Sequence, residues 1–207
     1  MKLYYSPAAC SLAPHIALSE SGLPYKTALV DLKKHMLADG TDYYRVNPKG
    51  YVPLLEQDDG TRLSEVAVIL QYIADRKPGT LAPAFGTMER YRLMEWLNFI
   101  ATELHKQFGP LWDPATPDAV RESQKAKLAT RFQLLAKTLG VQPYLTGESF
   151  TVADAYLFTV LNWAPMLKVD LAPFPALRQF QARVAARPAV HAALVAEGLV
   201  RKEAAAA

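Results

Sequence analysis

The strongest constraint on the fold is a change in sequence pattern near residue 80. Before this point short β-branched and apolar segments alternate with helical ones, whereas after it only the helical period of 3.6 residues remains. This pattern predicts an α/β part followed by an all-α part. We therefore expect two domains, residues 1–80 and 87–207, joined by a linker at 81–86 in a segment that carries proline and glycine.

The first part has the element order of a thioredoxin-like fold. Two strands enclose a helix over 11–21, and two further strands flank the strong turn signal Asp58-Asp59-Gly60. Ser64 is expected to cap a helix that ends at Asp75, and the segment 31–46 to be a loop or a short helix. The predicted strands cover residues 2–5, 25–30, 54–57 and 61–63. This order predicts a mixed sheet of four strands.

The second part is expected to consist of helices alone. The segment 87–108 has an apolar stripe on one face, formed by Leu93, Leu97, Ile100 and Leu104. Thr151 with Asp154 three positions later is typical of a capping box, and the apolar run 156–163 that comes next predicts a buried helix. The other predicted helices cover residues 117–139, 175–186 and 188–197.

Composition and charge exclude several kinds of partner. The net charge of +3 is spread along the chain, so we expect no nucleic acid partner. The longest apolar run, 66–70, is far shorter than the roughly 20 residues that span a bilayer, so no membrane segment is predicted. The single cysteine fits a reducing compartment and the first residues have no signal-like core, which together predict a cytoplasmic protein.

That single cysteine, Cys10, lies where the first predicted strand turns into the first helix. A helix N-terminus stabilises an anion, which favours ionisation of a thiol there or binding of another thiolate. The alternative is that a lone cysteine is a small buried hydrophobe. A thioredoxin-type dithiol is excluded because position 13 is alanine, so a redox cycle at Cys10 needs an external thiol.

Pro53 stands immediately before a predicted strand. In a thioredoxin-like sheet a proline at this point is typically cis, which leaves the backbone of Val52 free to pair with an extended peptide. The alternative is an ordinary trans proline at the start of an edge strand.

Ser64 and Glu65 form a polar pair at the start of an otherwise apolar helix. The first N–H groups of a helix bind a carboxylate, and Glu65 offers a partner for an ammonium, so the pair suits the α-amino acid end of a ligand. The alternative is that Glu65 only complements the helix dipole.

Asn98, Thr102 and His105 share one face of the helix predicted over 87–108. This face lies opposite the apolar stripe, so periodicity alone predicts that it is exposed to solvent and inert. The alternative is that it borders the first domain, where His105 can donate a hydrogen bond to a thiolate.

Taken together, these features resemble the bacterial beta-class glutathione transferases over nearly the whole chain, up to about Gly198. The segments that carry the resemblance are Tyr5-Ser6-Pro7, Ala9-Cys10-Ser11-Leu12, Val46-Asn47-Pro48-Lys49-Gly50, Val52-Pro53, Asp58-Asp59-Gly60, Glu95-Trp96-Leu97-Asn98, Thr102-Glu103-Leu104-His105-Lys106 and Phe150-Thr151-Val152-Ala153-Asp154-Ala155-Tyr156-Leu157-Phe158. Their order and spacing make the resemblance specific.

The resemblance implies a homodimeric enzyme in which glutathione is a co-substrate and attacks a small hydrophobic electrophile, with no metal and no cofactor. It implies two catalytic residues, Cys10 beside the glutathione sulfur, where it can form a mixed disulfide, and His105 as a stabiliser of the thiolate. The implied glutathione-binding residues are Cys10, His35, Val52, Pro53, Glu65, Val66, Asn98, Thr102 and His105.

Two positions depart from the family pattern. His35 stands where a lysine is common near the glycyl carboxylate, and a mostly neutral imidazole is a weaker anion partner, for which Lys33 or Lys34 can substitute. Val66 stands where a small residue is usual, which narrows the γ-glutamyl pocket.

Two other functions use the same residues. One is a glutathione-dependent disulfide reductase that works through a mixed disulfide at Cys10, and the other is a non-catalytic carrier of hydrophobic ligands. Tyr5 and Ser11 are further candidate donors to the thiolate, and three aromatic residues are equally suited to the core or to a substrate pocket. These aromatic residues are Phe108, Trp112 and Trp163.

Overall fold

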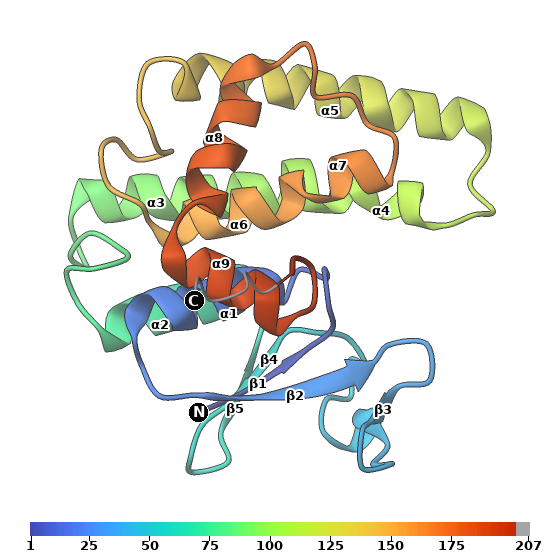
Figure 1. The fold of residues 1–207 in the computed structure, drawn as a ribbon, viewed down its shortest axis with the longest axis vertical. Coiled ribbons are helices and arrows are strands. Elements are labelled where there is room, and N and C mark those ends of the chain that lie inside the picture. Colours follow the sequence, from blue (N-terminus) through green and yellow to red (C-terminus); the bar gives the residue numbers. More distant parts are fainter. Residues whose placement is uncertain (202–207) are drawn as a thin grey trace, which may run out of the picture.

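The computed structural model describes residues 1–201. The first part of the chain contains a mixed sheet of five strands (Figure 1). The central strand β1 (Lys2–Tyr5) pairs in parallel with β2 (Lys26–Asp31), which it reaches through the helix α1 (Leu12–Ser21). On its other side β1 pairs antiparallel with β4 (Leu54–Glu56), which forms a hairpin with β5 (Arg62–Ser64). The predicted thioredoxin-like order is confirmed.

Two details of this part differ from the prediction. A two-residue strand, β3 (Met36–Leu37), pairs with the end of β2 and adds a fifth strand, and a 3₁₀ turn, η1 (Tyr43–Arg45), comes after it. A strand this short has no period to detect. Ser64 does not cap the next helix, because it still belongs to β5, and Glu65 occupies the N-cap position of α2 (Val66–Arg76) with a φ of 73°.

Helices alone come after β5 in the part of the chain that the structure describes. The longest rod has three consecutive segments, α3 (Met88–Phe99), the π-helix η2 (Ile100–His105) and α4 (Lys106–Trp112), and it runs past its predicted end at Phe108. The remaining helices are α5 (Asp118–Leu139), α6 (Val152–Leu161), α7 (Trp163–Met166), α8 (Pro175–Ala185) and α9 (Pro188–Ala196). No helix within residues 1–201 is long and apolar enough to cross a membrane.

The two parts share one hydrophobic core. Figure 1 shows α1 and α2 between the sheet and the helices α3 and α6, with α5 and α8 outermost. Every residue of α6 is buried, and α6 packs against α1, α2 and α8. The predicted stripe at Leu93, Leu97, Ile100 and Leu104 is buried in the same core. Leu81 also lies there, so the domain limits at 80 and 87 stay a prediction.

The start of α6 is held by the capping box that the sequence predicts. The Asp154 carboxylate accepts hydrogen bonds from the backbone N–H and the hydroxyl of Thr151, both at 2.8 Å, and from the backbone N–H of Leu145 at 2.8 Å. Burial raises the pKa of Asp154 to about 6, although these three bonds act in the opposite direction. The carboxylate therefore joins the loop before α6 to the first turn of the helix.

We expect Asp154→Ala to lower the free energy of unfolding by about 2–4 kcal/mol, because it removes the cap and leaves buried donors unpaired. Urea denaturation measures this loss. As a matched control, Asp170→Ala removes an exposed carboxylate that accepts one backbone bond, from Ala172, and we expect it to cost less than about 1 kcal/mol. Equal losses in the two variants would contradict the role given to Asp154.

Candidate active site

The loop between β1 and α1 places Cys10 beside Val52. Within this loop the Ser11 hydroxyl donates to the carbonyl of Ser6 at 3.2 Å and accepts from its N–H at 3.1 Å. The Cys10 thiol donates to the carbonyl of Val52 at 3.3 Å, and the peptide bond between Val52 and Pro53 is cis, as predicted. These segments meet because β1 pairs with β4, the strand that Pro53 precedes.

The C-terminal part of the chain also holds this loop. Ala8 has a φ of 61°, and its N–H donates to Glu197 at 3.1 Å while its carbonyl accepts from the Trp163 indole at 2.8 Å. The Glu197 carboxylate is also hydrogen-bonded to Nδ1 of the buried His15 of α1, at 2.8 Å. The conformation of the loop before Cys10 thus depends on residues that are far away in the sequence.

His105 comes from a π-helical turn of the long helical rod that borders the same region. In a π-helix the backbone bonds span five residues, which widens the turn and changes the phase of the residues after it. His105, the last residue of η2, is half-buried, and its ring lies against those of Tyr156 and Trp163, with centroids 5.9 and 4.9 Å away. Asn98 and Thr102 are exposed, so the three residues do not share the environment that an α-helical period predicts.

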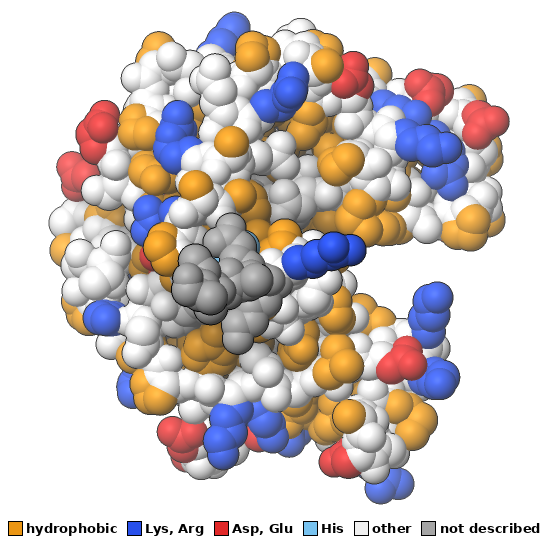
Figure 2. All heavy atoms as spheres, in the orientation of Figure 1, with side chains coloured by type: hydrophobic (Ala, Val, Ile, Leu, Met, Phe, Trp, Pro, Cys, Tyr) orange, Lys and Arg blue, Asp and Glu red, His pale blue; other side chains and the backbone are white. Residues whose placement is uncertain are grey.

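Cys10 and His105 line one cavity of about 320 Å³. The first part of the chain contributes Cys10, Tyr51, Val52, Pro53, Glu65, Val66 and Ala67, and the second contributes Ala101, His105, Lys106 and Tyr156. Figure 2 shows that the surface is deeply notched between the helices α4 and α5 and the end of the sheet that carries β3, with hydrophobic side chains along the walls. The cavity therefore lies between the two parts and needs both.

Three of the predicted binding residues are not among the residues that line this cavity. Asn98 and Thr102 are exposed to solvent. His35 contacts other groups instead: its Nδ1 is 2.9 Å from the carbonyl oxygen of Gly50, and its ring lies against Tyr44. Their roles in binding glutathione stay predictions.

Five residues that line this cavity are not among the predicted binding residues: Tyr51, Ala67, Ala101, Lys106 and Tyr156. Tyr156 belongs to the apolar run that predicts a buried helix, so its hydroxyl is the only feature in the sequence that could have indicated a role in the cavity. The sequence did not decide whether three aromatic residues belong to the core or to a substrate pocket. Phe108 and Trp163 are buried, whereas Trp112 is 46% exposed.

The thiol and the imidazole are both neutral in this cavity. Burial raises the pKa of Cys10 to about 12, and the backbone N–H groups at the start of α1 and the charge of Lys106 oppose this only in part. The helix N-terminus thus acts on the pKa of Cys10 in the expected direction, but burial has the larger effect and the thiol is not ionised at pH 7. Burial lowers the pKa of His105 to about 4, and the positive charge of Lys106 acts in the same direction.

The start of α2 forms the polar end of the cavity. Val66 and Ala67 lie in its first turn, where backbone N–H groups have no partner inside the helix. The Glu65 carboxylate beside them accepts a hydrogen bond from the ammonium of Lys49 at 2.6 Å, and the same ammonium donates to the Ser64 hydroxyl at 3.0 Å. This end thus offers N–H donors for a carboxylate and an exchangeable acidic partner for a cation.

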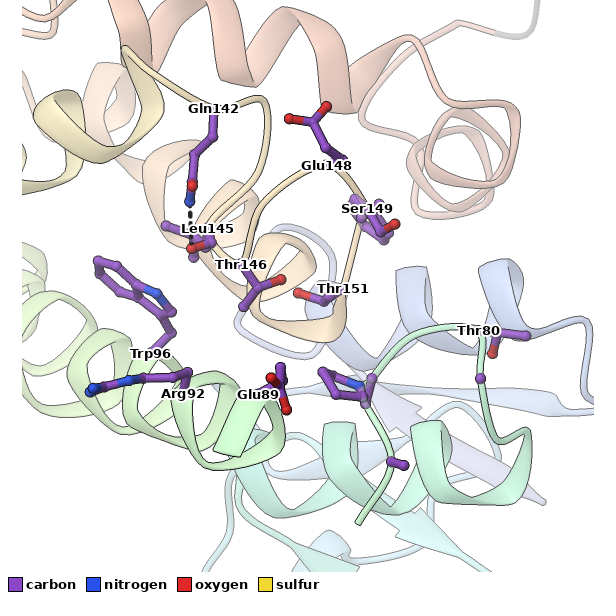
Figure 3. Close-up of a pocket in the computed structure, with 15 residues that line it drawn as sticks. Thr80, Glu89, Arg92, Trp96, Gln142, Leu145, Thr146, Glu148, Ser149 and Thr151 are labelled. Carbon is purple, nitrogen blue, oxygen red and sulfur yellow. Dashed lines mark hydrogen bonds between the residues drawn. The ribbon is translucent and has the colours of Figure 1, made fainter. Parts of the chain in front are cut away.

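A larger cavity of about 630 Å³ lies between the segment after α2, the start of α3 and the loop before α6 (Figure 3). Arg92 and Trp96 extend into it from α3, and across from them Gln142 donates to the carbonyl of Leu145 at 2.9 Å. Its lining, within residues 1–201, contains no cysteine and no histidine. Of these two cavities, the smaller one contains both predicted catalytic residues, Cys10 and His105.

Comparison with known proteins identifies the family. The model of the glutathione S-transferase N-terminal domain matches residues 8–76, and that of the C-terminal domain matches residues 99–188. The glutathione S-transferase GstA of Escherichia coli O157:H7 is 49% identical over 201 residues, which cover 96% of this chain and 100% of the relative. The chain belongs to the glutathione S-transferase family.

Solved structures of glutathione S-transferases support the assignment to the beta class. The beta-class enzyme of Sphingomonas chungbukensis superposes with a TM-score of 0.93 at 45% identity, over 97% of this chain and 100% of that one. A sphingomonad glutathione S-transferase in complex with glutathione superposes with a TM-score of 0.92 at 45% identity, with the same coverage. The predicted family, fold and enzyme class are confirmed.

We expect the Cys10 thiol of this glutathione S-transferase to react slowly with iodoacetamide at neutral pH, because only the thiolate reacts and its pKa is about 12. The alkylation rate should keep rising above about pH 9, beyond the usual thiol pKa of about 8.5. Mass spectrometry gives this rate directly, since Cys10 is the only cysteine. The urea-unfolded chain is the control, and a rate that levels off near pH 7 in the folded protein would contradict the expectation.

Proposed function

We propose that the cavity binds glutathione and lowers the pKa of its thiol, so that the thiolate attacks an electrophilic carbon of a small hydrophobic substrate. The observation that carries this proposal is the meeting of His105, Val52 and the start of α2 around one cavity beside Cys10. Support for the ligand comes from the sphingomonad relative, which was solved in complex with glutathione.

Glutathione is an extended peptide with an α-amino acid group at its γ-glutamyl end. In our proposal the peptide group of Val52 pairs with its cysteinyl backbone as an added strand would. The N–H groups at Val66 and Ala67 bind the γ-glutamyl carboxylate, and Glu65 binds the ammonium in place of the Lys49 contact. Val66 contributes its backbone N–H, and this donor is kept although the branched side chain narrows the γ-glutamyl end of the cavity.

His105 then acts as a neutral hydrogen-bond donor. With a pKa of about 4 its imidazole is too weak a base to hold the thiol proton, which leaves to solvent. A hydrogen bond to a charged acceptor contributes about 1.5–3 kcal/mol, which corresponds to a decrease of about one to two units in the pKa of the bound thiol. The sulfur next forms a bond to the electrophilic carbon, and the leaving group departs with its electron pair.

The neutral state of Cys10 favours conjugation over the disulfide reductase function. Attack on a mixed disulfide needs the Cys10 thiolate, and a pKa of about 12 leaves almost none at pH 7. Cys10 instead lines the cavity, and its thiol donates a hydrogen bond to the carbonyl of Val52. A carrier of hydrophobic ligands would bind glutathione and electrophiles without turnover.

We expect His105→Ala to lower kcat/KM for glutathione with an aryl halide by about 10- to 100-fold, because the donor to the thiolate is lost. Cys10→Ala should stay within a few-fold of the wild type. Steady-state assays between about pH 5.5 and pH 8.5 measure both. If Cys10→Ala abolished turnover and His105→Ala did not, the roles would be reversed, and binding of glutathione without turnover on any electrophile would favour the carrier.

We also propose that the enzyme works as a homodimer in the cytoplasm, where a lone free thiol stays reduced. Large apolar side chains are exposed at Tyr51, Val68, Met88 and Tyr91, and we assign the contact between protomers to them. Sedimentation velocity should give a dimer for the wild type. Val68→Glu should shift it to a monomer, whereas Val141→Glu, at another exposed valine, should leave the dimer intact; a dimeric Val68→Glu would exclude this surface.

A further inference from the structure

Tyr156 contacts the proposed thiolate donor directly. Its hydroxyl lies 2.7 Å from Nδ1 of His105, and the two rings meet edge to face at 88°. Tyr156 comes from the buried helix α6 and is only 2% exposed, so it approaches His105 from the core side of the cavity. Within residues 1–201 the Tyr156 hydroxyl has no other hydrogen-bond partner, and His105 has none at Nε2.

The proton in this hydrogen bond can be placed by accounting for donors and acceptors. A neutral imidazole carries one N–H donor and one acceptor nitrogen. If Nδ1 of His105 donated to Tyr156, the hydroxyl proton would have no acceptor among residues 1–201, and Nε2 would present only a lone pair. If the hydroxyl donates to Nδ1, its proton is satisfied and the remaining N–H lies on Nε2. Each arrangement leaves one donor without a partner among these residues: the hydroxyl of Tyr156, which is 2% exposed, or Nε2 of the half-buried His105. A buried unpaired donor costs about 1–3 kcal/mol, so the arrangement that leaves the free donor on His105 is favoured.

We propose that Tyr156 donates its hydroxyl proton to Nδ1 of His105 and thereby fixes the tautomer with the proton on Nε2, which makes Tyr156 the positioning residue of the thiolate donor. Nε2 lies across the ring from Nδ1, so in this tautomer the N–H of the imidazole is directed away from Tyr156. The consequence for catalysis rests on the proposed function. The tautomer itself is a property of the ligand-free protein.

The surroundings support a neutral pair with a fixed ring. Burial raises the pKa of Tyr156 above its usual value and lowers that of His105, so neither group is charged at pH 7. The charged or titratable groups that influence the pair are Lys106, Glu65 and Cys10. Trp163 packs against the imidazole at 4.9 Å with an angle of 67° between the rings. Without the tyrosine hydroxyl, a flip of the ring would exchange the two nitrogens.

The first test is the tautomer in the ligand-free wild type. Long-range ¹H–¹⁵N correlation spectra of protein labelled in its four histidines distinguish the two tautomers, and His105→Gln identifies the signal. We expect the proton on Nε2 and a hydrogen-bonded, unprotonated Nδ1. A proton on Nδ1 would overturn the proposal. This readout does not depend on turnover, so it stands apart from the success or failure of the proposed function.

The second test is Tyr156→Phe, which removes only the hydroxyl. The apparent pKa of the acid limb in the pH profile of kcat/KM should increase by about one unit, so that kcat/KM at pH values below this pKa falls about tenfold. Binding of S-methylglutathione, which has no thiol to ionise, should stay within about twofold. Tyr72→Phe is the matched control, because this hydroxyl donates to Gln57 at 2.9 Å and Tyr72 does not line the cavity. An unchanged pH profile in Tyr156→Phe, or the same shift in both variants, would overturn the proposal.

Discussion

Every residue of α6 is buried, because this helix lies between the two parts of the chain. This helix packs against α1 and α2 from the sheet-bearing part and against α8 from the helical part, so neither part has a closed core without it. The Asp154 cap fixes where the helix begins, and that start sets the position of Tyr156 in the cavity. Trp163, the first residue of α7, donates a hydrogen bond to the carbonyl of Ala8 ahead of Cys10. The stability of the core and the geometry of the site are therefore consequences of the same packing.

Burial also sets the electrostatic character of the site. It neutralises Cys10 and His105 by moving their pKa values in opposite directions, away from the physiological range. Fixed donors around a neutral cavity can stabilise an anion that forms there without reorganising, which is the property that the proposed function uses. The positive groups near it, Lys106 and Lys49, lie at its rim and are exposed. The low-dielectric interior makes each hydrogen bond to a thiolate stronger than it would be in water.

Local patterns in the sequence predicted most of the elements, because periodicity, turn residues and caps depend on near neighbours. The hairpin at Asp58-Asp59-Gly60 and the capping box before α6 were predicted for this reason. Features that depend on distant contacts were not predicted: the edge strand β3 exists only through pairing with β2, and the left-handed φ of Glu65 belongs to the junction of β5 with α2. The pKa of Cys10 is likewise a property of its burial. Tyr156 was read as core because its surroundings are apolar, and only its position opposite His105 gives its hydroxyl a role.

The π-helical turn η2 interrupts an otherwise continuous α-helical rod. Upstream of it the rod turns its leucines to the core, and downstream it still buries Phe108 and Leu111, while His105 at the junction borders the cavity. Successive residues of an α-helix are rotated by about 100°, so deleting one residue from this turn would rotate everything up to Trp112 by about that angle. We therefore expect a change in length at this point to disturb the cavity. When relatives are aligned, a one-residue gap between positions 100 and 105 would mean that a different side chain takes the place of His105 in the cavity.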